Sequence, residues 1–572
     1  MKIIKGKSIA PGFAAGRAFV CKARPTVLVP RYRVRPEEVD EECRRFEQAV
    51  SLAVAELQRA YGRVHSELGK PEAEIFDVHL AMLSDAYFAD RVRHRIKADL
   101  VNCEQAVEAE IDNLARALQN AEDGYLSERA ADIRDVGERL LDHLVQAPQP
   151  FLAGLEPQTV LVVEELLPSD TLKLDREHVA AIVTERGGPT GHAAILARAM
   201  GIPAITGVEG ATRLIAPGSR LLVDGECAEI TLLPTDTQRQ QFDARMSRYR
   251  QASEAAVDAE QQHCATLDGH EITLLANIGR PAEAREVTLH NLDGVGLFRT
   301  EFLFLDDSRP PDFERQLRCY RDACRALGHR PLVIRTLDLG GDKHPLFLQD
   351  LAETNPNLGL RGLRFSLEAA ADLFETQLRA IVQCAAMGDV RVMFPMVLGG
   401  DDFRHAASIF RQLEVPGSTT DKPIPVGAMI ETPSALFTIE DILEEADFLS
   451  LGTNDLTQFM LAADRNATAV MADYSILHPA VLRAIRGVID AAAARGKPLS
   501  VCGEAAGDPV IASLLVGLGI RSLSMSPGLA ARVRYQLRHS RLDTLAELAN
   551  DTLKQPGIEA VKSLVHRVCK AQ

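Results

Sequence analysis

Polar residues that could act on a phosphate ester follow a series of short apolar runs in the second half of the chain. In chain order they are Arg299, Arg335, Asp338, Glu431, Asn454, Asp455, Cys502 and Glu504. Arginine guanidinium groups bind planar oxyanions bidentately, so Arg299, Arg335 and the nearby Arg465 suit a substrate that carries phosphate and carboxylate groups. Glu431 and Asp455 offer hard oxygen ligands for a magnesium ion that also coordinates substrate oxygens. Together these residue types indicate phosphoryl transfer.

Each of these residues also has a purely structural explanation. Arginines at a rim often pair with neighbouring carboxylates, and a cysteine after an apolar strand, such as Cys502, is commonly a small buried hydrophobic residue. For any one residue the structural explanation is the stronger. Because the charged groups follow successive strands rather than lying inside them, the set as a whole favours a functional site.

A single histidine lies between a glycine-proline turn and an apolar segment in GGPTGHAAILARAMGIPAITG, residues 187–207. The preceding VAAIVTERGG reads as a strand and a turn, and a helix is expected to start at about Thr190, which places His192 in its first turn. Backbone amides at a helix start favour an anion, and a neutral imidazole nitrogen can act as a nucleophile and carry a phosphate. Two alternatives stay open, a histidine satisfied by local backbone hydrogen bonds and a metal ligand, although no second histidine or cysteine stands at ligand spacing.

The elements that must position the first set of residues alternate short apolar runs with longer helical patterns. The runs are EITLLANIG, GVGLFRTEF, PLVIRTLDLGG, RVMFPMV, PVGAMIETP, DFLSLGTNDL, PLSVCGEAAG and SLSMSP. Eight such units in residues 266–572 predict a (β/α)8 barrel, whose active site lies at the C-terminal ends of its strands. A short extended piece near Leu358 to Arg361 competes for one strand position.

The first half predicts three further parts. From Pro36 to Gln146 apolar positions recur three and four residues apart almost throughout, which indicates a bundle of four or more helices, and we place this part within residues 22–146. β-like runs in residues 1–21 and 147–232 bracket this bundle, so it is expected to be inserted into an α/β domain that carries the histidine. Residues 233–265 are polar with helical spacing and predict an exposed linker helix. The predicted fold is a multidomain α/β protein with an inserted helical bundle, followed by the barrel.

Composition limits the partners and the compartment. With 572 residues, 64 basic and 80 acidic, the formal net charge is −16, which argues against nucleic acid or an anionic membrane surface as a partner. The ten cysteines include no CxxC pair, which indicates a reducing compartment. No apolar run has the length of a signal peptide core or a membrane span, so we expect a cytoplasmic protein.

The motifs together resemble one enzyme family. GGPTGHAAILARAMGIPAITG resembles the phosphohistidine segment of enzymes that use phosphoenolpyruvate. GVGLFRTEFLF, GGDK, MFPM, ETP, GTNDLTQ, DR and CGEAAGD resemble the barrel of enzyme I of the bacterial phosphotransferase system. SIAPGFAAGRAF and LSERAADIRDVGERLL, which related synthases and dikinases do not share, extend the resemblance over the whole chain. Combined motifs of this kind are far more specific than a lone glycine pattern.

The resemblance implies a phosphoenolpyruvate-protein phosphotransferase that works with Mg2+ and forms a homodimer through its barrel. His192 would receive the phosphoryl group and pass it to the carrier protein HPr, Cys502 would protonate the enolate carbon to give pyruvate, and Glu431 with Asp455 would hold the magnesium ion. The implied substrate-binding positions are Arg299, Arg335, Asn454, Asp455 and Arg465, with Arg361 and Lys343 near the substrate in less defined roles. Thr190 and Arg198 match supporting positions beside the histidine.

The resemblance also implies a large movement. If the barrel holds the donor and the bundle holds HPr, the histidine domain must swing between them. The bundle begins with the acidic residues Glu37, Glu38, Asp40, Glu41 and Glu42. They could attract a basic carrier, although a solvated helix face explains them equally simply.

Beside the histidine the sequence departs from the family, since Pro189 and Gly191 stand where an arginine and a serine are common. We expect the reaction type to be retained because His192, Thr190 and Arg198 remain, whereas the transfer rate and the choice of carrier stay open.

Three alternatives compete with this interpretation. The chain could be an enzyme I paralogue of a nitrogen-regulatory branch, which the sequence does not distinguish from a sugar-transport enzyme. A dikinase or synthase would need a large nucleotide-binding domain, and no P-loop is present. A non-enzymatic regulator that docks a carrier would be expected to lack the charged barrel residues.

Overall fold

The computed structural model describes most of the chain as two compact units, residues 1–250 and 251–572. The described residues are 2–21, 29–67, 79–119, 124–145, 155–166, 178–187, 197, 201–305, 309–339, 355–414, 423–463 and 474–571. Among their helices, none is both long and apolar enough to cross a membrane.

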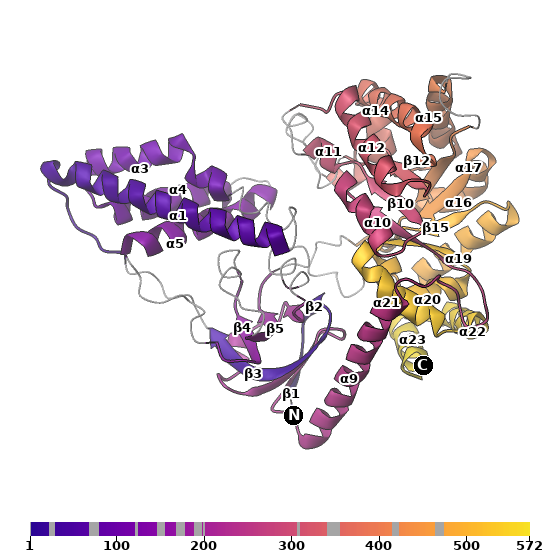
Figure 1. The fold of residues 1–572 in the computed structure, drawn as a ribbon, viewed down its shortest axis with the longest axis horizontal. Helices are drawn as coiled ribbons and strands as arrows, with labels where there is room; N and C mark the ends of the chain where they lie inside the picture. Colours follow the sequence, from indigo (N-terminus) through magenta and orange to yellow (C-terminus); the bar gives the residue numbers. More distant parts are fainter. Residues whose placement is uncertain are drawn as a thin grey trace. The chain divides into compact units, whose positions relative to one another are not determined.

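The second unit contains a closed barrel of eight parallel strands, as the alternation of apolar runs predicts (Figure 1). In chain order the strands are β9 (Thr273–Ile278), β10 (Gly294–Arg299), β11 (Leu332–Arg335), β12 (Val390–Phe394), β13 (Val426–Ile430), β14 (Phe448–Leu451), β15 (Leu499–Val501) and β16 (Ser522–Met525). Each strand pairs with the next, and β16 closes the ring against β9. The piece near Leu358 is not a strand, since Pro356–Leu358 forms a short 3-10 helix.

Helices surround the barrel and bury its outer face. They are η2 (Pro281–Arg285), α10 (Glu286–Leu289), α11 (Phe302–Leu305), α12 (Phe313–Leu327), η4 (Pro356–Leu358), α13 (Gly362–Glu368), α14 (Ala371–Cys384), η5 (Ala385–Met387), α15 (Gly400–Leu413), α16 (Pro433–Phe437), α17 (Ile439–Glu445), α18 (Thr453–Leu461), α19 (Pro479–Ala494), η6 (Glu504–Gly507), α20 (Pro509–Leu518), η7 (Pro527–Leu529), α21 (Ala530–Arg538), α22 (Leu542–Leu553) and α23 (Ile558–Ala571). One large apolar core joins these helices to the outward-facing strand residues.

The first unit contains an eight-stranded mixed sheet with the order β1-β8-β7-β3-β4-β5-β6-β2. Its strands are β1 (Lys2–Lys5), β2 (Lys7–Ala10), β3 (Phe13–Cys21), β4 (Thr159–Val163), β5 (Val179–Thr184), β6 (Ala204–Thr206), β7 (Arg220–Asp224) and β8 (Glu229–Leu232), with the short helix α8 (Ala211–Leu214) between β6 and β7. Along β4, Leu161 and Val163 enter one core whereas Val160 and Val162 enter another, because successive strand side chains point to opposite faces. The sheet is therefore covered on both faces, as its continuous apolar strands require.

Between β3 and β4 the chain forms the predicted helices. They are η1 (Pro36–Glu38), α1 (Val39–Glu67), α3 (Ala86–Asp99), α4 (Cys103–Gln119) and α5 (Gly124–Val145). The α1, α3 and α4 positions that recur every three or four residues are buried in one core, which includes Phe46, Leu57, Val92, Ile96 and Val107.

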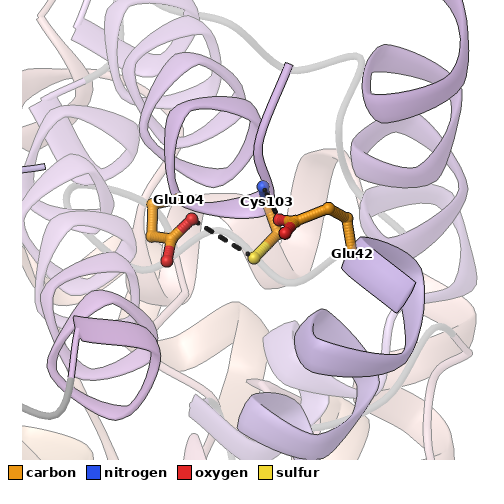
Figure 2. A group of neighbouring side chains, drawn as sticks. All are labelled: Glu42, Cys103 and Glu104. Carbon is orange, nitrogen blue, oxygen red and sulfur yellow. Dashed lines mark hydrogen bonds between the residues drawn. The ribbon is translucent and has the colours of Figure 1, made fainter. Parts of the chain in front are cut away.

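The start of α4 is satisfied by a side chain from α1 (Figure 2). The Cys103 backbone N–H donates a hydrogen bond of 2.8 Å to the Glu42 carboxylate, and Arg45 pairs with both Glu42 and Glu104. Glu42, Cys103 and Glu104 lie close enough together to suggest a metal site, but Arg45 already pairs with both carboxylates and Asn102 donates a hydrogen bond to Glu104. Because Glu42 is buried, it does not belong to the exposed acidic residues at the start of the bundle.

Helix α9 (Asp236–Ala259) lies within the predicted linker and is mostly exposed along its length. Its part up to Tyr249 packs against the sheet domain, since Phe242 and Tyr249 contact the ring of Phe13 and Arg245 pairs with Asp224.

Candidate active site

The candidate site residues of the barrel lie at the carboxyl ends of its strands, and strand periodicity points three of them toward the barrel interior. Leu297, Val333 and Met429 belong to a small inner apolar cluster, separate from the core under the helices. In a strand, the residue two positions after an inward-facing residue also faces inward. Arg299, Arg335 and Glu431 occupy these next positions, so the barrel interior ends in charged groups.

Several candidates fall outside the described residues. These are His192, Thr190, Arg198, Lys343 and Arg465. The departures at Pro189 and Gly191 lie outside them as well. The roles of all these residues therefore stay predictions.

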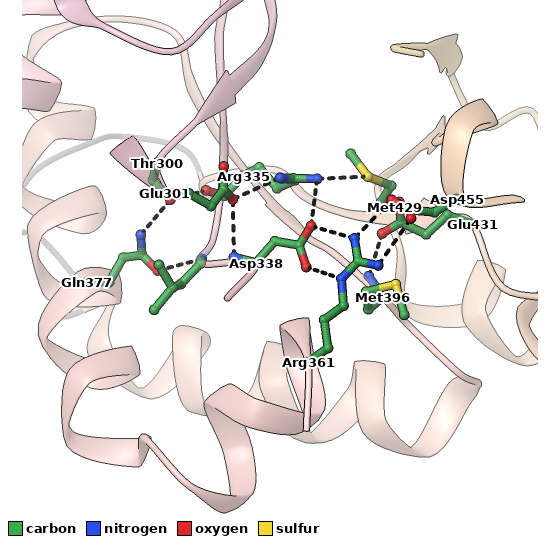
Figure 3. A network of polar contacts seen from close by, with 11 residues as sticks. Thr300, Glu301, Arg335, Asp338, Arg361, Gln377, Met396, Met429, Glu431 and Asp455 are labelled. Atoms are coloured by element: carbon green, nitrogen blue, oxygen red, sulfur yellow. Dashed lines mark hydrogen bonds and ion pairs between the residues drawn. The ribbon is translucent and has the colours of Figure 1, made fainter. Parts of the chain in front are cut away.

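Arg335 is buried and is held by three neighbours (Figure 3). Its guanidinium donates to Glu301 at 2.8 Å, lies 3.2 Å from an Asp338 oxygen and contacts the Met429 sulfur at 3.7 Å. Burial alone lowers the pKa of Arg335, but the adjacent Glu301 and Asp338 carboxylates raise it above its ordinary value. Arg335 is therefore a permanently charged group in a place from which water is largely excluded.

Arg361 joins carboxylates from two strand ends. Its guanidinium donates to Asp338 at 3.1 and 3.2 Å and to Asp455 at 3.1 and 3.0 Å, as Figure 3 shows. Arg361 immediately precedes α13, whereas Asp455 lies in the first turn of α18, directly after β14. The geometry matches the planar guanidinium fork to two carboxylates at once.

Glu431 is a buried acid beside other acids. One of its oxygens accepts a hydrogen bond of 2.7 Å from the Met396 backbone N–H. Burial, followed by the nearby charges of Asp455 and Asp338, raises the pKa of Glu431 to about 8. The charges of Arg335 and Arg361 oppose this rise in pKa but do not cancel it.

Cys502 directly follows β15 and lies in the inner cluster with Met429. Its thiol donates to the Leu451 carbonyl at 3.5 Å. Burial raises the pKa of Cys502 to about 11, so the sulfur keeps its proton at neutral pH. A protonated thiol at this position can donate a proton.

Two candidates at the rim are less tightly held. Asn454 accepts a hydrogen bond of 3.4 Å from the Glu504 backbone N–H, which ties the turn after β14 to the turn after β15. Arg299, the last residue of β10, is half-buried, and no ion pair joins it to another residue in the described part of the chain. Its charge is therefore available to an anionic ligand.

Glu301 is a member of this site that the sequence patterns did not single out. It lies two residues after β10 and is 1% exposed, and its carboxylate binds Arg335. Its position after a strand end was a usable signal, since the same rule selected the other residues. Gln377, which supports the site from within α14, carried no such signal because polar residues inside helices usually face solvent.

The buried charges of the site do not balance. Four buried carboxylates face two buried arginines, and the members are Glu301, Asp338, Glu431, Asp455, Arg335 and Arg361. Excess carboxylate raises the cost of burial unless a cation joins the set. Burial raises the pKa of Glu431 first, and the neighbouring Asp455 and Asp338 charges raise it further. Hard oxygen ligands of this kind fit a divalent cation such as Mg2+.

Comparison with known proteins gives three family matches along the chain. The model of the PEP-utilising enzyme, PEP-binding domain, matches residues 253–542 and covers the barrel. The model of the N-terminal domain of PEP-utilising enzymes matches residues 5–129, and that of their mobile domain matches residues 155–227.

Full-length relatives agree with these matches. A phosphoenolpyruvate-protein phosphotransferase of Enterococcus faecalis is 37% identical over 578 aligned positions, which cover 100% of both chains. Proteins of the same name from Bacillus subtilis and Haemophilus influenzae are each 34% identical, and the alignments cover 100% of both chains for the first and 98% of both for the second.

Proposed function

This chain belongs to the phosphoenolpyruvate-protein phosphotransferase family, enzyme I of the phosphotransferase system, and we propose which of its residues carry out the phosphoryl transfer from phosphoenolpyruvate to HPr. The structural observation that supports the proposal best is the buried set of arginines and carboxylates at the carboxyl ends of the barrel strands. Such a set suits a reaction in which charge on a phosphoryl group must be stabilised away from water.

In the first half-reaction the barrel holds phosphoenolpyruvate. Arg299, Arg335, Arg361 and Arg465 bind its phosphate and carboxylate oxygens, with Asn454 and Lys343 beside them. The bond between phosphorus and the enolate oxygen breaks as a ring nitrogen of His192 bonds to phosphorus, so the histidine becomes phosphorylated and the enolate of pyruvate is left. Thr190 and Arg198 support the histidine and its phosphate.

The enolate then needs one proton at its terminal carbon. Cys502 supplies it, because its raised pKa of about 11 keeps the thiol protonated at neutral pH. Cys502 also lies in the same inner cluster as Met429, whose sulfur contacts Arg335. The resulting thiolate regains a proton from solvent before the next turnover.

A divalent cation completes the site, and we propose Mg2+ held by Glu431 and Asp455. When bound, it neutralises charge on the phosphoryl oxygens and on the enolate oxygen. The excess of buried carboxylates and the raised pKa of Glu431 support this assignment.

In the second half-reaction the phosphohistidine passes its phosphoryl group to HPr. The helical bundle docks the carrier, and the sheet domain carries His192 between bundle and barrel. This proposal uses the predicted domain boundaries. They are 1–21 with 147–232 for the sheet domain, 22–146 for the bundle, 233–265 for the linker and 266–572 for the barrel. A homodimer through the barrel and a cytoplasmic location complete it, and sedimentation of the purified chain would test the dimer.

The central experiment uses phosphoenolpyruvate labelled in its phosphate, with Mg2+ and no nucleotide. We expect a base-stable, acid-labile label on the wild-type chain and none on His192→Ala, while the control His178→Ala, which changes another histidine of the same domain, is labelled normally. Label on His192→Ala at the wild-type level would overturn the assignment. A requirement for ATP would point to a dikinase, and an unlabelled wild type would point to a regulator.

A further inference from the structure

Glu301 is a buried carboxylate directly beside Arg335, and it has no role in the proposed reaction so far. Glu301 is 1% exposed and sits between the end of β10 and the start of α11. One of its oxygens, Oε1, accepts two hydrogen bonds, one of 2.8 Å from the Arg335 guanidinium and one of 3.1 Å from the Asp338 backbone N–H. A single atom therefore fixes both the side chain that ends β11 and the turn that follows it (Figure 3).

The residue before Glu301 holds the main chain of the same arginine. The Thr300 hydroxyl donates a hydrogen bond of 2.9 Å to the Arg335 carbonyl, and Gln377 donates one of 3.1 Å to that hydroxyl. The Gln377 side-chain oxygen accepts from the Leu337 backbone N–H at 2.9 Å. Two consecutive residues after β10 thus hold the backbone and the guanidinium of Arg335 in one orientation.

The second oxygen of Glu301 behaves differently. Oε2 is buried and has no hydrogen-bond partner within the part of the chain that the structure describes. A buried oxygen without a partner costs free energy, so the hydrogen bonds that hold Glu301 are those accepted by Oε1. The described side-chain hydrogen bonds of Glu301 run to Arg335 and to the backbone N–H of Asp338.

We propose that Glu301 is a positioning residue for phosphoryl transfer, which orients the Arg335 guanidinium through the two hydrogen bonds accepted by Oε1. The inference rests on the proposed function, since it takes Arg335 to bind phosphoenolpyruvate. A small rotation of a substrate-binding guanidinium misplaces the phosphoryl group relative to its acceptor, and misplacement of this kind lowers the rate of the chemical step. The action of Glu301 is geometric, so the oxygen acceptor matters and the negative charge does not.

Three variants separate geometry from charge. Glu301→Ala removes the acceptor, and Glu301→Asp keeps the charge but withdraws the carboxylate by one methylene. Glu301→Gln keeps an oxygen acceptor at the Oε1 position. Its amide nitrogen replaces Oε2, which accepts no described hydrogen bond, so no described hydrogen bond is lost. The matched control is Asp447→Ala, because Asp447 also accepts from one arginine, Arg411, at 3.0 Å and from one backbone N–H, that of Val426, at 2.8 Å, but at the amino ends of β13 and β14.

The measurement is single-turnover phosphorylation of His192 by labelled phosphoenolpyruvate in the full chain with Mg2+, as a function of substrate concentration. We expect Glu301→Ala and Glu301→Asp to lower the maximal rate at least about tenfold, and Glu301→Gln to stay within about threefold of wild type. Asp447→Ala is expected to lower thermal stability and to leave both the maximal rate and the half-saturating concentration unchanged. A residue that only stabilised the fold would reduce the amount of active protein without this order among the variants.

Wild-type rates in Glu301→Ala would overturn the inference, and so would a Glu301→Gln protein as slow as Glu301→Ala. If Glu301→Ala does not fold, the comparison of Glu301→Asp with Glu301→Gln decides: a slower aspartate variant supports the inference, and an equal or faster one overturns it. A wild-type chain that takes no label at all would overturn the proposed function itself, which is a different result from an active wild type and an unaffected variant.

Discussion

Both carboxylate oxygens of Asp455 accept a hydrogen bond from Arg361, which precedes it by 94 positions in the chain. The same guanidinium also binds both oxygens of Asp338. One arginine therefore holds together two acids from different strand ends, in a place where their mutual repulsion would otherwise be strong. This arrangement, together with Arg299, which has no ion pair among the described residues, and the raised pKa of Glu431, leads to specific expectations.

Replacement of Arg361 by alanine is expected to destabilise the barrel strongly. It leaves the buried Asp455 without the arginine that binds both of its oxygens, whereas Asp338 keeps its contact with Arg335. Removal of one partner from a buried ion pair costs about 3–5 kcal/mol. Hydrogen exchange of barrel peptides in increasing denaturant measures the effect. In the Arg361→Ala background, Asp455→Asn should restore at least about 1 kcal/mol because it removes one unpaired charge. No restoration would contradict the proposed role of Arg361.

Arg299 should behave in the opposite way. Because no ion pair holds it within the described residues, Arg299→Ala is expected to change stability by no more than about 0.5 kcal/mol. Its loss should raise the half-saturating phosphoenolpyruvate concentration about tenfold or more, because charge-assisted bonds to an anion are lost. Arg299→Lys should recover part of the affinity. Unchanged affinity in Arg299→Ala would remove this residue from the substrate site.

The metal-free protein should lose stability as pH rises because of Glu431. Its pKa is raised to about 8 in the folded state from 4.5, so below 4.5 both states hold the proton and the group has no effect. Between these values the unfolded state releases its proton first, which lowers the free energy of unfolding by up to about 5 kcal/mol above pH 8.

Glu431→Gln should abolish this part of the pH dependence. Denaturant midpoints of the metal-free wild type and variant between pH 5 and 9 measure it. Added Mg2+ should stabilise the wild type more at pH 8.5 than at pH 6, since a proton competes with the cation for the carboxylate. Parallel pH curves for the two proteins would show that Glu431 does not titrate in this range.

Cys502→Ala should separate binding from protonation. We expect the rate of pyruvate formation to fall about 10²- to 10⁴-fold, which is the usual contribution of a positioned acid, while the half-saturating phosphoenolpyruvate concentration changes little. Cys264→Ala is the control, because Cys264 is equally buried and burial raises its pKa to about 12, but it lies in the core under the helices. Equal rates for the two variants would rule out Cys502 as the proton donor.

Two neighbouring acidic residues at the start of the bundle, Glu41 and Glu42, should differ in their effect on stability. Glu42→Ala removes the acceptor of the Cys103 N–H and one partner of Arg45, so it should destabilise the bundle by about 1–3 kcal/mol. Glu41→Ala removes only an exposed pair with Arg44 and should change stability by less than about 1 kcal/mol. Hydrogen exchange of α1 and α4 peptides measures both. Similar losses in the two variants would contradict the structural role of Glu42.

The eight barrel strands could be predicted from the sequence because each is a short apolar run that alternates with a longer helical pattern. The alternation that puts Leu297 in the barrel interior also puts Arg299 at its mouth, and this relation is local in the chain. The bundle helices and the strands around them were predictable for the same reason, since periods of two and of about 3.6 residues are properties of the sequence alone.

The pairing of the charged groups was decided by the tertiary structure. Nothing near Arg361 in the sequence indicates that it binds Asp455, and the sequence around Glu301 does not reveal that its carboxylate holds Arg335. Likewise, Glu42 resembles its exposed acidic neighbours until α4 brings Cys103 against it. These partners are distant in the chain, and only closure of the barrel and packing of the helices bring them within hydrogen-bond distance. Local patterns determine which face a side chain occupies, whereas its partner across that face depends on how all the elements pack.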